Sequence, residues 1–135
     1  MKSTLIPGIS RTRTLIVDRP RTIDFLGEEL RVYATPELVR DFEVASRELL
    51  LEHCDAGEDS VGTGINVTHT GATLAGMQVE IHVQVKEVAG RMITLALSAR
   101  DGIESISMGE HSRAVVSVEK LRVRVAAKRD AAGSP

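Results

Sequence analysis

The chain has 135 residues, of which 42% are hydrophobic, and this suits a single compact domain over residues 1–135. A formal net charge of -2 and an aromatic content of 2% argue against nucleic acid or an anionic membrane as a partner. Cys54 is the only cysteine and no apolar run approaches a membrane span, so we expect a soluble cytoplasmic protein without an internal disulfide.

In chain order, the first predicted element is a strand over Arg11–Asp18, where apolar and polar residues alternate loosely. The segment Thr22–Tyr33 contains a glycine followed by two glutamates and indicates an irregular stretch. A long helix follows, from about Pro36 to about His53, with Thr35 offering an N-cap hydroxyl. Its apolar residues recur at helical spacing and form a stripe that needs a sheet to pack against: Leu38, Phe42, Ala45 and Leu49.

The second half of the chain is typical of strands, because apolar and polar residues alternate. Strands are expected over Val61–His69, Met77–Val85, Ile93–Ala99 and Ile103–Val118. Glycine-containing pairs indicate the hairpin turns between them, and Gly109 indicates a bulge. The order of one strand, a long helix and four antiparallel strands predicts an α+β fold with about five strands. Its core spans about residues 11–120, and a basic, partly disordered tail is expected over 121–135.

Two titratable residues stand out in this pattern. His69 shares a strand face with two apolar residues, the face expected to look inward, so it is either a hydrogen-bonded core histidine or a functional one. Glu43 lies in mid-helix at the edge of the apolar stripe. It either forms a surface ion pair with Arg47 or Arg40, or it is half covered and able to act as a base or nucleophile.

Possible hydrogen-bond donors accompany these two residues. Thr35 is either an N-cap alone or also a group at a helix N-terminus, where developing negative charge is favoured. Gly62 and Gly64 either mark close backbone packing or let an amide donate to an oxyanion. The sequence has no metal-ligand pattern, phosphate-binding loop or serine elbow, so we expect neither a metal site nor a cofactor.

Two motifs resemble those of a known family. The strand motif VTHT at Val67–Thr70 and the later motif HSRAV at His111–Val115 are similar to the fluoroacetyl-CoA thioesterase-like family of hotdog proteins. Upstream, the Ala-Thr pair ending at Thr35 and the helical Glu43 match the family pattern, with spacings to the glycine and histidine that fit without a gap. The resemblance covers most of the domain and implies a hotdog fold, in which one curved antiparallel sheet wraps a long helix.

The resemblance also implies an acyl-CoA thioesterase in which Thr35, Glu43 and His69 form the catalytic group. In that interpretation Glu43 is the base or the direct nucleophile, and His69 is the acid/base toward the coenzyme A thiolate. Thr35 orients or donates a hydrogen bond, with its hydroxyl as an alternative nucleophile. Gly62 helps to hold the thioester, and Arg113 meets the polar arm of coenzyme A unless it is an outward strand-face arginine. Coenzyme A is then part of the substrate and not a cofactor.

Hotdog thioesterases commonly build each pocket from the helix of one subunit and a strand of its partner. The resemblance therefore implies at least a homodimer, with a tetramer left open, in which Glu43 and His69 can meet across chains. The sequence departs from the family pattern in the segment before Thr35, which covers the acyl pocket in the fluoroacetyl-specific branch. That branch is rich in phenylalanine there, whereas DFLGEELRVY has only Phe25 and Tyr33 as aromatics. We expect a small or short-chain acyl-CoA as substrate and assign no fluoroacetate selectivity.

Two other functions fit a hotdog domain. A non-catalytic module that binds acyl-CoA or a small acid would keep the pocket, would not need Glu43, and would release no thiol. An enoyl-thioester hydratase would need an Asp/His hydratase motif, which we do not find. The leading prediction is hydrolysis of acyl-CoA to the free acid and coenzyme A.

Overall fold

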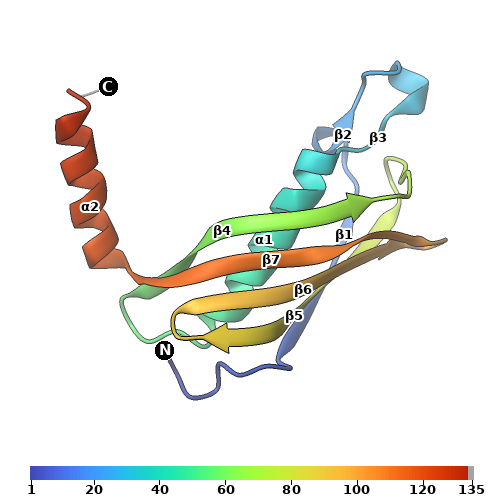
Figure 1. The fold of residues 1–135 in the computed structure, drawn as a ribbon. Coiled ribbons are helices and arrows are strands. Elements are labelled where there is room, and N and C mark those ends of the chain that lie inside the picture. The colour runs from blue at the N-terminus through green and yellow to red at the C-terminus, as the bar shows by residue number, and fades with distance from the viewer. Residues whose placement is uncertain (134–135) are drawn as a thin grey trace.

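A long helix and a five-stranded antiparallel sheet form the body of the protein, and a second helix leads away from one end of the sheet (Figure 1). The structure is a computed structural model that describes residues 1–133. The elements in chain order are β1 (Ser10–Ile16), η1 (Arg19–Arg21), β2 (Thr22–Ile23), η2 (Glu28–Leu30), β3 (Val32–Tyr33), α1 (Thr35–Leu51), β4 (Glu58–His69), β5 (Gln78–Ala89), β6 (Met92–Asp101), β7 (Ser105–Ser117) and α2 (Val118–Ala131).

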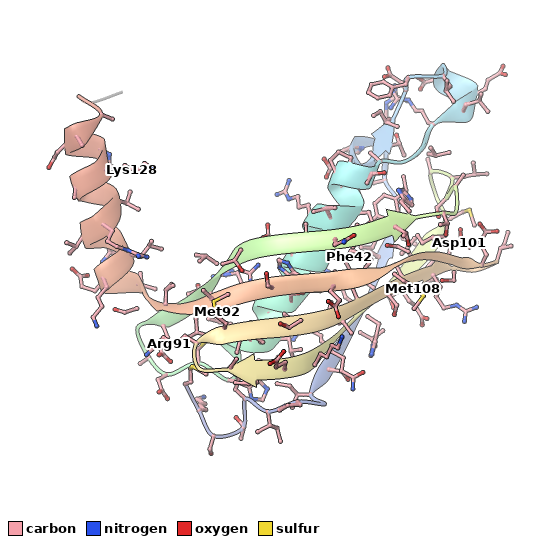
Figure 2. All side chains as sticks on the ribbon, viewed as in Figure 1. Phe42, Arg91, Met92, Asp101, Met108 and Lys128 are labelled. Carbon is pink, nitrogen blue, oxygen red and sulfur yellow. The ribbon has the colours of Figure 1, made fainter. Side chains whose placement is uncertain are left out.

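Helix α1 forms where the apolar stripe predicted it. Pro36 lies in the first turn, where its missing N–H costs no hydrogen bond. The N-cap prediction for Thr35 is wrong, because Ala34 is the N-cap residue and Thr35 is already helical, so its hydroxyl is free for another role. Helix α1 packs on β1, β4 and β5. The apolar residues that it buries are Leu38, Phe42 (labelled in Figure 2), Ala45, Leu49 and Leu50.

The sheet has the strand order β1-β5-β6-β7-β4, and all neighbouring strands are antiparallel. The four strands predicted for the second half are confirmed as β4 to β7. Gly109 marks no bulge, because the register is continuous there, and the glycine instead makes room for the β4 backbone at Asn66. One of the two apolar residues that share the strand face of His69 is Ile65; because β4 is an outer strand, Ile65 remains 38% exposed although this face was expected to look inward.

The segment Thr22–Tyr33, which was expected to be irregular, contains a short hairpin. Its strands β2 and β3 pair through Thr22 with Tyr33 and Ile23 with Val32, between β1 and α1. The other five strands form one antiparallel sheet that wraps α1 (Figure 1), and the predicted hotdog fold is confirmed.

Helix α2 was not expected from the sequence. The Ser117 hydroxyl accepts a hydrogen bond from Lys120 N at 3.3 Å where the helix begins, and good helix formers follow. None of its residues is buried, and Figure 2 shows Lys128 on this helix where it extends away from the sheet. The tail predicted to be partly disordered is therefore helical over Val118–Ala131, whereas its positions 134 and 135 lie outside the described residues. No helix within residues 1–133 is long and apolar enough to cross a membrane.

Candidate active site

Thr35 and His69 lie together, at the start of α1 and the end of β4. The Thr35 hydroxyl oxygen is 2.7 Å from His69 Nδ1. The second ring nitrogen, Nε2, is buried and has no hydrogen-bond partner within residues 1–133. Burial lowers the pKa of His69, and the Gly71 backbone opposes part of that shift. A neutral imidazole that is oriented by a hydroxyl and has one unused nitrogen can accept or deliver a proton.

A cavity of about 580 Å³ adjoins this pair. The Tyr33 ring stands edge-on to the His69 imidazole, with ring centroids 6.3 Å apart and ring planes at 81°. A mostly apolar wall with a few polar groups at one side suits a small acyl chain bound next to a reactive carbonyl. The wall comes from the β2–β3 hairpin, the start of α1 and the loop after β4: Ile23, Phe25, Val32, Tyr33, Ala34, Thr35, Pro36, His69, Thr70, Gly71 and Ala72.

Glu43 lies further along α1, in different surroundings. Arg113 Nη1 donates to Glu43 Oε2 at 3.2 Å, whereas Arg47 binds Asp59 at 2.7 Å. The alternative of a surface ion pair between Glu43 and Arg47 or Arg40 is therefore wrong. The Glu43 side chain is 50% exposed, while Arg113 as a residue is only 3% exposed, so the outward-facing alternative for Arg113 is wrong as well.

Buried hydrogen bonds fix Arg113 behind the Glu43 carboxylate. Its Nε and Nη2 atoms donate to the hydroxyl and carbonyl oxygens of Ser60, both at 2.8 Å, and Nη1 lies 3.2 Å from His111 Nε2. Because His111 Nδ1 is 2.7 Å from Gly64 O, where it can only donate, Nε2 is left as an acceptor for the guanidinium. Burial lowers the pKa of both His111 and Arg113. Because His111 is neutral, the ionic partner of the Arg113 guanidinium in this group is the Glu43 carboxylate.

Gly62 allows the Glu43 carboxylate to lie against β4. A Cβ atom at this position would lie far inside van der Waals contact with Glu43 Oε2. The Gly62 backbone is not in the left-handed region, so the requirement is for space and not for an unusual φ. Gly62, Glu43 and Arg113 thus form one group, and Thr35 and His69 form another.

The two groups are well separated within one chain. A rise of about 1.5 Å per residue puts Glu43 about 12 Å from Thr35 along α1. A rise of about 3.3 Å per residue puts Gly62 roughly 23 Å from His69 along β4. A single chain therefore unites Thr35 with His69 but does not bring Glu43 to the same carbonyl group.

Comparison with known proteins identifies the family. A family model described as fluoroacetyl-CoA-specific thioesterase matches residues 17–119. The chain belongs to this family. A curated member, the fluoroacetyl-CoA thioesterase of Streptantibioticus cattleyicolor, is 34% identical over 124 residues, which are 92% of this chain and 86% of the relative. The protein is accordingly a thioester hydrolase.

Solved structures agree with this membership. A crystal structure of a point mutant of the fluoroacetyl-CoA-specific thioesterase has a TM-score of 0.85 and 32% identity, and the match covers 94% of this chain and 99% of that chain. A thioesterase superfamily member from Thermus thermophilus has a TM-score of 0.86 and 22% identity over 95% of this chain and 96% of its own, and shows the same fold.

Within this thioesterase, sequence reasoning named Arg113 and Gly62 but missed the two residues that hold Arg113 in place, His111 and Ser60. His111 had a usable signal, because it alternates with Arg113 and Val115 on the buried face of β7. Ser60 had none, since its contact with Arg113 depends on the pairing of β4 with β7. Within residues 1–133, no three His, Cys, Asp or Glu side chains gather as metal ligands would.

Proposed function

We propose that this thioesterase hydrolyses a small or short-chain acyl-CoA to the free acid and coenzyme A, and that it acts as a homodimer. Each catalytic group would consist of Thr35 and His69 from one protomer and Glu43 from its partner. The observation that carries the proposal is the division of the candidate residues into two separate, hydrogen-bonded groups, one towards each end of β4. A family member solved with fluoroacetate and CoA supports the substrate class.

The position of β4 supports a homodimer. It is a long outer strand whose free edge and exposed central residues invite pairing with another chain. Antiparallel pairing of β4 with its copy, about a two-fold axis at Asn66, would put Gly62 opposite the partner's His69, because the register shift between Gly62 and Gly64 adds one residue to the strand. The same operation would bring Glu43, which lies over Gly62, towards the partner's Thr35. Both sites of the dimer would be completed at once.

The chemistry then divides among the residues as follows. Glu43 either takes a proton from a water that attacks the carbonyl carbon, or attacks that carbon itself, displacing coenzyme A and forming an anhydride that water then hydrolyses. His69 acts as the acid in its protonated form: it delivers this proton to the departing coenzyme A sulfur and takes up another from water afterwards. The Thr35 hydroxyl holds the imidazole through Nδ1. The N-terminal end of α1 favours the negative charge that develops on the carbonyl oxygen.

Arg113 and Gly62 act on Glu43 in this scheme. Arg113 fixes the carboxylate by a charge-assisted hydrogen bond, and Gly62 leaves the space in which it lies. The apolar wall beside His69 receives the acyl group, which the cavity volume of about 580 Å³ leaves ample room to bury.

A panel of acyl-CoA thioesters with detection of free thiol tests the activity. Wild-type protein should release thiol from short acyl-CoA, and Glu43→Gln or His69→Ala should lower turnover by about two to four orders of magnitude. Glu48→Gln is the matched control, because this carboxylate also lies on α1 and binds Arg11 and Arg13 away from the cavity. Binding of acyl-CoA without thiol release by the wild type would favour the non-catalytic module instead.

Mixing two inactive variants tests the shared site. When Glu43→Gln and His69→Ala dimers are dissociated and reassociated together, mixed dimers carry one site with both residues intact. Random reassociation should restore about a quarter of wild-type activity, because about half of the dimers are mixed and each has one working site. If the mixture stays as inactive as its parents although mass spectrometry finds mixed dimers, the shared site is wrong.

A further inference from the structure

Asp41 is a buried carboxylate that the proposed mechanism does not use. It lies on α1, is 5% exposed, and accepts hydrogen bonds from two other elements. Arg21 donates to it through Nε at 2.9 Å and through Nη2 at 3.1 Å, and the Tyr33 hydroxyl donates to Oδ2 as well. A buried carboxylate is costly unless such donors surround it, and an apolar residue would fill a core position at lower cost. A role beyond packing would explain why the chain has an acid here.

The two donors flank the β2–β3 hairpin. Arg21 directly precedes β2, and Tyr33 is the last residue of β3. A backbone hydrogen bond also joins the two ends of the hairpin, because Ala34 N donates to Arg21 O at 2.8 Å. One carboxylate on α1 therefore ties both ends of the hairpin, while its tip is exposed, with Phe25 at 84%.

This hairpin is also a wall of the active-site cavity. Ile23, Phe25 and Val32 line the cavity opposite the start of α1 and the end of β4. The Tyr33 ring, whose hydroxyl Asp41 holds, stands edge-on to the His69 imidazole. Movement of Tyr33 would therefore change the hairpin wall and the packing of His69 together.

We propose that Asp41 is a positioning residue which, through Arg21 and Tyr33, fixes the hairpin wall of the acyl pocket and the orientation of the His69 imidazole. The inference rests on the proposed function for its effect on catalysis. Its structural half, the anchoring of the hairpin, can be measured without any substrate.

Hydrogen exchange and steady-state kinetics on the full-length protein test the two halves. Asp41→Asn removes the charge that binds Arg21, and Tyr33→Phe removes a single donor with little change in volume. Glu48→Gln is the matched control, because it also removes a carboxylate on α1 that binds two arginines, with neither of them in the hairpin. All assays are run at least ten degrees below the melting temperature of each variant, about the margin that keeps the unfolded fraction small.

In Asp41→Asn, amides in residues 19–34 should exchange at least about 10-fold faster, while the β5–β6 amides stay unchanged. Its kcat should fall about 10- to 100-fold, with a smaller change in KM, because loss of alignment acts mainly on the chemical step. Tyr33→Phe should show the same pattern to a lesser degree, and the double variant should lose less than the product of the two single losses. Glu48→Gln should match the wild type in both measurements.

Unchanged hairpin exchange in both Asp41→Asn and Tyr33→Phe would overturn the anchoring, whatever the kinetics. Faster exchange with an unchanged kcat would overturn the positioning role. If Asp41→Asn does not fold, Tyr33→Phe alone decides by the same two criteria. A wild-type protein inactive on every thioester would refute the proposed function, and with it the catalytic half of this inference, whereas the exchange data would still decide the anchoring.

Discussion

Replacing Gly62 by alanine tests whether the place of Glu43 over β4 matters for activity. The added methyl carbon would lie far inside van der Waals contact with Glu43 Oε2, so the carboxylate has to retreat by about 1 Å. This movement weakens its hydrogen bond to Arg113, which is 3.2 Å long in the structure. Misplacement of a reacting group by this distance costs on the order of 100-fold in rate, so kcat should fall by about that factor.

The protein itself should tolerate the substitution. The Gly62 backbone is not left-handed and the Glu43 side chain is half exposed, so the carboxylate can turn towards solvent. We expect the melting temperature to change by no more than about 4 °C, which corresponds to less than about 1 kcal/mol for a domain of this size.

Gly64→Ala is the matched control, because it lies on the same strand and its Cβ would meet only the Ser112 hydroxyl, at 3.1 Å. Thiol release from the best acyl-CoA of the panel gives kcat and KM for each variant. In a Glu43→Gln background, Gly62→Ala should add little further loss, because the group that it displaces has already lost its function. Wild-type kcat in a folded Gly62→Ala protein would refute the argument.

Three further predictions concern a buried histidine, the core and the free edge of β4. Burial lowers the pKa of His111 below its ordinary value of 6.5, so the unfolded chain takes up a proton first, and stability should decline as the pH falls below about 6.5. The melting temperature of His111→Asn should decline less over that range, and an equal decline would contradict the assignment. Phe42→Ala should destabilise the protein by about 3–5 kcal/mol in urea unfolding, because this fully buried ring joins α1 to the sheet. Ile65→Pro removes an N–H that faces the free edge of β4, and sedimentation should show a lighter, inactive species if this edge forms the dimer.

The sequence alone was sufficient for most of the fold. The helical stripe through Leu38 and Phe42 and the alternation of β5 and β6 are local patterns, and periodicity reports directly which side of each element is buried. The Ala-Thr pair and the VTHT motif led to Thr35 and His69, which the structure brings within a hydrogen bond of each other. The N-cap role of Thr35 was wrong and helix α2 was not predicted, because capping and marginal helices depend on a few local hydrogen bonds that residue types specify weakly.

Contacts across the sheet could be found only in the tertiary structure. That Glu43 binds Arg113, that Gly62 makes room for its carboxylate, and that Asp41 joins both ends of the hairpin are consequences of where α1 packs against the strands. A pattern along the chain shows which residues face inward, but it does not show which residues on different elements face one another. The sequence therefore determined the elements and the types of the candidate residues. The packing of α1 and β7 against β4 decided that Thr35 and His69 form one group and Glu43 and Arg113 another. The reason is that contacts between distant parts of the chain set these distances, and a local periodic pattern carries no information about them.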